Sequence, residues 1–160
     1  MDKIIWCAEK REGLRLIEPN PNLAGAYLMK AENALETMAT TTVSEWKIST
    51  AYYTLYFSLY SLLMKTGIKC EIHSCTIEFA RQFLGEYFTE EDLSLLESSL
   101  KARIDAQYYV DRTVPDGQYQ RMVLAAPKFL VRCKSLLQVL DEKKVESIRK
   151  KFSERLRRGH

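Results

Sequence analysis

Apolar residues recur along most of the chain with the 3.6-residue period of an amphipathic helix. This pattern predicts five helices, at residues 23–40, 44–66, 74–84, 89–109 and 118–140. No short stretch alternates cleanly between apolar and polar positions, as a half-buried strand would. We therefore expect an all-α protein built as an up-and-down bundle of four to five helices.

Residues that cap or break helices support these boundaries. Thr89 is followed three positions later by Asp92, which is the pattern of a capping box at the start of a helix. Gly67 suits the left-handed conformation that often ends a helix. Pro127 removes one backbone hydrogen bond, so it predicts a kink in the fifth helix. The other expected end residues are Asn22 and Ser74 as N-caps and Gly85 as a C-terminal glycine.

The two ends of the chain differ from the middle. Residues 1–22 combine a brief apolar run with Gly13 and a Pro-Asn-Pro-Asn segment, which predicts a short helical turn and an irregular approach to the bundle. Residues 23–140 form the expected bundle. Residues 141–160 hold eight cations and four anions and predict a basic C-terminal helical extension or tail.

Composition narrows the class of protein. The chain has 160 residues, of which 46% are hydrophobic and 28% charged, and this excludes disordered and fibrous proteins. Its net charge is +3, and because the last twenty residues carry +4, the rest is close to neutral. Attraction to nucleic acid would therefore come from the C-terminal segment or from a local patch.

The sequence predicts a cytoplasmic protein without a membrane span. Residues 48–64 are free of charge, but their serines, threonines and four tyrosines favour a buried helix over lipid. The N-terminus lacks the long apolar region of a secretory signal. The four cysteines, which show no Cys-x-x-Cys spacing, are expected to be reduced thiols: Cys7, Cys70, Cys75 and Cys133.

Cys70, His73 and Cys75 place three soft ligands within six residues. The chain offers no matching second pair of ligands, so we expect neither a bound metal nor a cofactor.

The helix at 44–66 is apolar over most of its circumference. Tyr52, Tyr56 and Tyr60 form one row along it, and Tyr53 and Phe57 form the neighbouring row. A single bundle rarely covers so wide an aromatic surface. The pattern therefore predicts a homodimer, with an interface at Tyr53, Tyr56, Phe57 and Tyr60.

Three short segments, in this order, resemble the HEPN family (higher eukaryotes and prokaryotes nucleotide-binding). They are Ala51-Tyr52-Tyr53 at the entry to the second helix, His73-Ser74, and Arg103-Ile104-Asp105-Ala106-Gln107-Tyr108. The resemblance covers about residues 23–140. It implies a helical bundle, a homodimer, and a gene beside a minimal nucleotidyltransferase in a toxin–antitoxin pair.

Many members of that family are metal-independent ribonucleases with an Arg followed four to six residues later by a His. Here the residues five and six positions after Arg103 are Tyr108 and Tyr109. An ordinary tyrosine phenol titrates near 10 and is a poor base at neutral pH. Only Arg155 and His160 have the spacing, and they lie at the chain end. The resemblance thus favours binding of a nucleotide or RNA without cleavage. The alternatives are a divergent ribonuclease and a helical adaptor that binds only protein.

Arg103 lies almost directly above Leu96 on an apolar helix face and so needs a partner. One interpretation is an internal ion pair with Asp105 or with an acid of a neighbouring helix. The other is an anion site, in which Arg103 holds a phosphate in bidentate fashion beside aromatic rings. The candidate nucleotide- or phosphate-binding residues are Arg103, Tyr108, His73 and Tyr52.

Six cations near the C-terminus surround Phe152 and Leu156. They form either a solvated helix face or a surface that binds RNA or an acidic partner. The six are Arg149, Lys150, Lys151, Arg155, Arg157 and Arg158.

Overall fold

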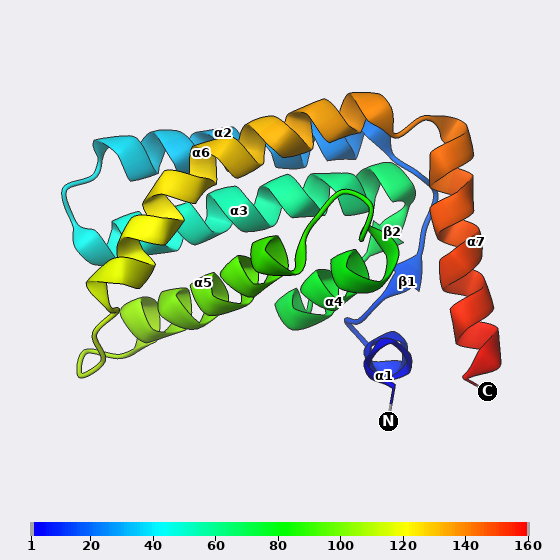
Figure 1. The fold of residues 1–160 in the computed structure, drawn as a ribbon, viewed down its shortest axis with the longest axis horizontal. Coiled ribbons are helices and arrows are strands. Elements are labelled where there is room, and N and C mark those ends of the chain that lie inside the picture. The colour runs from blue at the N-terminus through cyan, green and yellow to red at the C-terminus, as the bar shows by residue number, and fades with distance from the viewer. Residues whose placement is uncertain (1, 160) are drawn as a thin grey trace.

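The computed structural model describes residues 2–159, and the all-α prediction is confirmed. Within those residues the chain forms seven helices and one short antiparallel ribbon (Figure 1). The helices are α1 (Lys3–Glu9), α2 (Pro21–Thr40), α3 (Ser44–Thr66), α4 (His73–Phe83), α5 (Glu90–Tyr108), α6 (Asp116–Val139) and α7 (Glu142–Arg158), and the strands are β1 (Arg15–Leu16) and β2 (Ile68–Lys69).

Helix α3 is the centre of the fold. It packs against α2, α5 and α6, contacts α4 near its middle through Tyr52 and Tyr56, and meets α7 at its C-terminal end. Tyr52, Leu55, Leu59 and Leu63 on α3 are fully buried. The apolar circumference of this helix is therefore covered by other elements of the same chain, and it does not by itself require a second copy.

The local signals for helix ends were partly right. Thr89 and Asp92 form the expected capping box, and Gly67 has a φ of 73° after α3. Asn20, rather than Asn22, caps α2: its side chain accepts from the Leu23 N–H at 2.9 Å, and Pro21 takes the first helical position, where no N–H is needed.

Helix α4 also differs from its predicted limits. It begins at His73 after Ile72, so Ser74 lies inside the first turn and does not cap the helix. It ends with Leu84 as the C-cap, and Gly85 follows in the turn.

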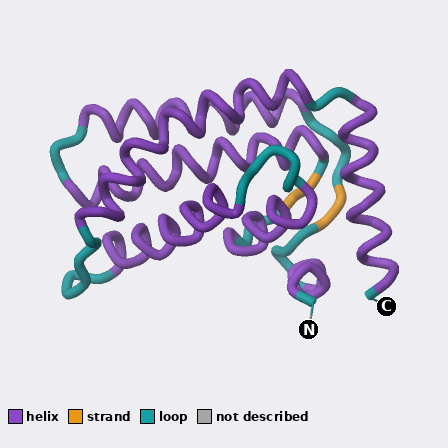
Figure 2. Tube along the Cα trace, in the orientation of Figure 1, coloured by secondary structure: helices purple, strands orange, loops and turns teal. Residues whose placement is uncertain are grey.

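Helix α6 continues through Pro127 and changes direction along its length, as the sequence predicted (Figure 1, Figure 2). Its first half rises from the end of the bundle where α5 stops, and its second half runs beside α2.

The segment before α2 is more ordered than the sequence predicted. Arg15 pairs with Lys69 and Leu16 with Ile68, so β1 and β2 form a two-residue antiparallel ribbon (Figure 2). Strands this short leave no alternation to detect in the sequence. The ribbon fixes the start of the chain against the turn that links α3 to α4.

The prediction that all four cysteines are reduced was wrong. Cys7 on α1 and Cys75 on α4 form a disulfide, with their Cα atoms 5.7 Å apart. Cys70 and Cys133 are free and buried. The bonded pair is 68 residues apart in sequence, so only the packing of α1 on α4 brings it together.

Helix α7 crosses the end of the bundle (Figure 1) and buries Val145, Ile148 and Phe152 in the same core as Ile4 and Leu14. None of the helices described over residues 2–159 is long and apolar enough to cross a lipid bilayer.

Arg149 on α7 is not a surface cation. Its Nη1 donates to the carbonyl oxygens of Ile17, Thr66 and Gly67 at 2.7, 3.0 and 2.9 Å. The Thr66 and Gly67 carbonyls lie at the C-terminal end of α3, where the helix leaves acceptors unpaired, so Arg149 serves as a cap supplied from a distant helix.

Candidate functional site

Three helices bring together three of the four residues predicted to bind a phosphate or nucleotide. Tyr52 lies on α3, His73 is the first residue of α4, and Arg103 lies on α5. The Tyr52 hydroxyl and His73 Nδ1 form a hydrogen bond of 2.7 Å. The Arg103 guanidinium carbon is 5.3 Å from the centre of the Tyr52 ring. Tyr52 therefore stands between the arginine and the histidine.

Arg103 has hydrogen bonds only to neutral groups among the described residues. Its Nη1 donates to the Tyr53 hydroxyl at 3.1 Å and to Gln107 Oε1 at 3.4 Å. Its Nε is buried and reaches no acceptor. Tyr108, the fourth candidate, is largely exposed, with its ring centre 5.9 Å from the guanidinium carbon.

The expected ion pair between Arg103 and Asp105 does not form. Asp105 is instead held by Lys101 and Arg112, each at 2.9 Å. No carboxylate within residues 2–159 lies within salt-bridge distance of Arg103. The half-buried guanidinium therefore has no carboxylate partner among the described residues.

His73 is neutral at physiological pH. Burial lowers its pKa to about 4, and the nearby Arg103 charge contributes in the same direction. Its ring stacks on Tyr56 with the ring centres 3.9 Å apart. Burial also raises the pKa of Tyr52 above its usual range, so Tyr52 keeps its proton at neutral pH. The bond between the two side chains is thus a neutral hydrogen bond.

The aromatic rows of α3 are mostly internal. Tyr56 and Tyr60 are 4% and 5% exposed, and their hydroxyls lie within hydrogen-bond distance of Thr76 Oγ1 and the Cys70 N–H. Of the four residues predicted for a homodimer interface, only Tyr53 and Phe57 are half-buried and reach the surface. The wide aromatic surface that suggested a dimer is largely covered by α2, α4 and the chain before it.

A cavity of about 500 Å³ opens beside His73, between α2, α3 and the segment from Lys69 to His73. Lys69 and Glu71 also line it, and the Lys30 ammonium lies 4.9 Å from the centre of the Phe57 ring. This cavity was not predictable from the sequence, because its walls come from three separate elements. Its aromatic walls are Tyr27, Tyr56, Phe57, Tyr60 and His73.

The sequence also missed the direct partners of Arg103. Tyr53 was assigned to a dimer interface, and Gln107 was not considered. Gln107 follows Arg103 by four residues on one helix, and that spacing brings two side chains to the same face. It was the available signal for this contact.

The fold also bears on two other groups of residues that the sequence brought forward, the Cys70-His73-Cys75 ligand set and the Arg155-His160 pair. Cys75 is bonded to Cys7, so it is not free to bind zinc beside Cys70 and His73, and residues 2–159 contain no cluster of three suitable ligands. Arg155 pairs with Asp2. His160, its partner in the ribonuclease spacing, lies outside the described residues.

No protein-family model matches this chain, and no curated protein matches it. Any assignment of function therefore depends on the residues of the site and on the resemblance of its short motifs.

Proposed function

We propose that the chain is a HEPN-like protein that binds a nucleotide or RNA through a phosphate at Arg103, without cleaving it. The observation that carries this proposal is the missing counter-charge of Arg103. A guanidinium has five N–H donors in a planar fork, and here only Nη1 is engaged, by a hydroxyl and an amide oxygen. A phosphate oxygen would supply both the charge and the acceptors that the chain leaves out.

The surroundings of Arg103 suit such a ligand. Tyr53 offers a hydroxyl at the surface, Tyr108 an exposed ring, and Gln107 an amide, all within contact of the guanidinium. Rings beside an arginine are a common way to hold a base next to its phosphate. Asp105, two residues away on α5, is already paired with Lys101 and Arg112, which reduces its repulsion of an entering anion.

Calorimetric titration with inorganic pyrophosphate and with AMP tests the proposal. Arg103→Lys should weaken both by about ten- to hundredfold, since a lysine cannot replace two parallel guanidinium hydrogen bonds. The matched control is Arg132→Lys, because Arg132 is already paired with Asp92 through two bonds of 3.1 and 2.7 Å. Equal affinities in wild type and Arg103→Lys would refute the phosphate site. Binding should also weaken as salt rises.

The state of His73 favours binding over cleavage. A general base works best when its pKa is near the operating pH, and a pKa of about 4 makes His73 a weak base at neutrality. Its Nδ1 is also occupied by Tyr52. We therefore expect no cleavage of single-stranded RNA above background, with or without chelator.

A divergent ribonuclease is the second candidate, because Arg103, His73 and Tyr52 do meet although they come from three helices. RNA cleavage that survives chelator and is lost in both Arg103→Ala and His73→Ala would favour it over the first.

The partner rests on the resemblance to HEPN proteins alone. We propose a minimal nucleotidyltransferase, encoded by the neighbouring reading frame, and a homodimer in which Tyr53 and Phe57 are the remaining candidates for contact. Co-purification of the two gene products tests the first, and light scattering of the wild type and of Tyr53→Asp tests the second. If neither complex is seen, both proposed partners are refuted.

A further inference from the structure

The aromatic cavity beside His73 has no role in the phosphate site described above. It takes up about 500 Å³ between α2, α3 and the chain leading into α4. Tyr27 and Tyr60 meet edge to face in its wall, with ring centres 4.7 Å apart, and Phe57 lies beside Tyr27 at 5.9 Å. The wall is therefore aromatic on more than one side.

Two chains of contacts join this cavity to Arg103, which itself lies outside it. On the inner side, His73 lines the cavity and is hydrogen-bonded to Tyr52, the ring beside the guanidinium. On the outer side, Phe57 lines the cavity and stacks on Tyr53 at 5.5 Å, and Tyr53 is 5.5 Å from the guanidinium carbon. One ring therefore lies between the lining of the cavity and the arginine on each path: Tyr52 on the inner side and Tyr53 on the outer side.

We infer that the cavity is the base subsite of the ligand whose phosphate meets Arg103. The inference rests on the proposed function and deepens it, because it assigns the base of the nucleotide to a particular cavity. A nucleotide places a flat, π-rich base and an anionic phosphate on opposite sides of a ribose. The chain offers a ring-lined cavity and, beyond one intervening ring, a guanidinium without a carboxylate partner.

The chemistry of the cavity suits a base better than a sugar or an aliphatic group. Most of its wall is apolar, with Ile17, Leu23 and Met64 completing the aromatic lining. Stacking of a base on aromatic side chains is favourable for every base, because each has a π face. Lys69 and Glu71 are the charged groups in the lining and could meet the polar edge of a base.

Leu23→Trp blocks the cavity without touching Arg103. Leu23 lies on α2 and is 37% exposed, so a larger side chain there can fold toward the cavity without disturbing the core. Met29→Trp is the matched control: it puts the same side chain on the same helix at a residue that is 61% exposed and does not line the cavity.

Three probes separate the two parts of the ligand in calorimetric titrations: adenosine, inorganic pyrophosphate and AMP. Leu23→Trp should weaken adenosine and AMP by about tenfold and leave pyrophosphate unchanged, since it removes only base stacking. Arg103→Lys should weaken AMP and pyrophosphate and leave adenosine unchanged. Met29→Trp should change none of them.

The outcomes distinguish the two proposals. If Leu23→Trp leaves AMP unchanged while Arg103→Lys weakens it, the phosphate site stands and the base subsite is refuted. If neither AMP nor pyrophosphate depends on Arg103 while adenosine binding depends on Leu23, the cavity binds a base and the proposed phosphate site fails. If Leu23→Trp changes neither adenosine nor AMP, the inference is overturned regardless of Arg103.

The nucleotide can come free or as the end of an RNA strand. A 5′-phosphorylated adenosine trimer, added as a fourth probe, separates these sources. The trimer and AMP place the same base and phosphate in the site, so their affinities can be compared directly. Weaker binding of both the trimer and AMP by Leu23→Trp supports the subsite, and the tighter of the two identifies the source. A trimer that binds without competing with AMP and without any effect of Leu23→Trp contradicts it.

Discussion

The end of the molecule where α1, α4 and α7 meet differs from the face around Arg103 in the partners that its arginine contacts. At the first, which we call the cross-linked end, Arg81 reaches Glu78, Glu90 and Glu97 at 2.8, 3.1 and 2.6 Å. At the second, Arg103 meets a hydroxyl, an amide and rings, and no carboxylate among residues 2–159.

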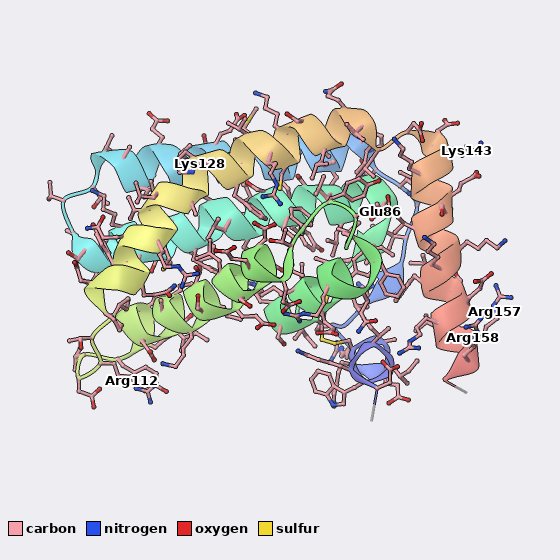
Figure 3. All side chains as sticks on the ribbon, viewed as in Figure 1. Glu86, Arg112, Lys128, Lys143, Arg157 and Arg158 are labelled. Carbon is pink, nitrogen blue, oxygen red and sulfur yellow. A yellow bond between two sulfur atoms is a disulfide. The ribbon has the colours of Figure 1, made fainter. Side chains whose placement is uncertain are left out.

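The difference separates a cation that is paired with carboxylates from one that meets only neutral groups, which is the one we propose for a ligand. A half-buried cation paired with carboxylates already has its counter-charge, and breaking its pair with the buried Glu78 costs stability. An unpaired one is tolerated only where something offsets it. The cations of α7 also differ among themselves: Arg149 caps α3, whereas Arg157 is exposed and points outward near the C-terminus (Figure 3).

The largest effect should come from the disulfide of the cross-linked end. Replacing Cys7 and Cys75 with serine should lower the free energy of unfolding by about 4 kcal/mol, the chain-entropy value for a loop of 68 residues. Urea denaturation measures it, and the reduced wild type should match the variant. AMP affinity should stay within about twofold. An unchanged stability would mean that the bond does not form in the protein in solution.

Removing Arg81 should cost less but still clearly more than removing Arg103. Burial by itself would raise the pKa of Glu78, and hydrogen bonds from Gln82 and Arg81 together with the Lys3 charge lower it instead. Arg81→Met takes away a hydrogen-bonded cation from a carboxylate that is 8% exposed, so we expect a loss of about 2–3 kcal/mol. Arg81→Lys should recover part of it. If Arg81→Met lost less stability than Arg103→Met, Arg103 rather than Arg81 would be the arginine that stabilises the fold.

The fold could be predicted from the sequence where its signals are local. Thr89 with Asp92, Gly67 and Pro127 each act within one helical turn, and all three behave as expected. The ends of the chain were less predictable, because Arg149 contacts Ile17 across 132 residues and Cys7 meets Cys75 across 68. Such contacts exist only after folding, and no spacing in the sequence encodes them.

The candidate site shows the same division. Arg103, Tyr52 and His73 were selected together, and the structure brings them together. Which acceptor Arg103 uses was not predictable: Asp105 is two residues away along α5 and turns to Lys101 and Arg112, while Tyr53 comes from another helix. The cavity beside His73 could not be predicted from the sequence either, because a cavity forms only where separate elements pack against one another.

A third prediction concerns pH and the face around Arg103. The pKa of His73 falls from 6.5 to about 4 in the folded protein because burial disfavours its charged form. Between these values the unfolded chain binds a proton that the folded chain does not, so stability falls as pH falls from 6.5 to about 4. Below about pH 4 His73 is protonated in both states, and its effect on stability no longer changes with pH.

His73→Gln removes this titration and so tests it. The loss of stability between pH 6.5 and 4 should be smaller in the variant than in the wild type by about 1–2 kcal/mol, allowing for the part of the side chain that solvent screens. Other groups titrate in both proteins and cancel in the comparison. Parallel pH profiles for the two proteins would show that His73 is not shielded from protonation.

The smallest effect on stability should come from Arg103→Met, and it is the one that most sharpens the comparison. The substitution removes a guanidinium whose Nε is buried without an acceptor and whose other bonds are to neutral groups, while the methionine keeps much of the stem packed on Tyr52 and Tyr53. We expect the free energy of unfolding to change by less than about 1 kcal/mol, because the lost hydrogen bonds are offset by relief of the unpaired donor. Pyrophosphate binding should fall by at least about tenfold in the same variant. A loss of stability as large as that of Arg81→Met, with no ligand bound by the wild type, would make Arg103 a structural residue like Arg81.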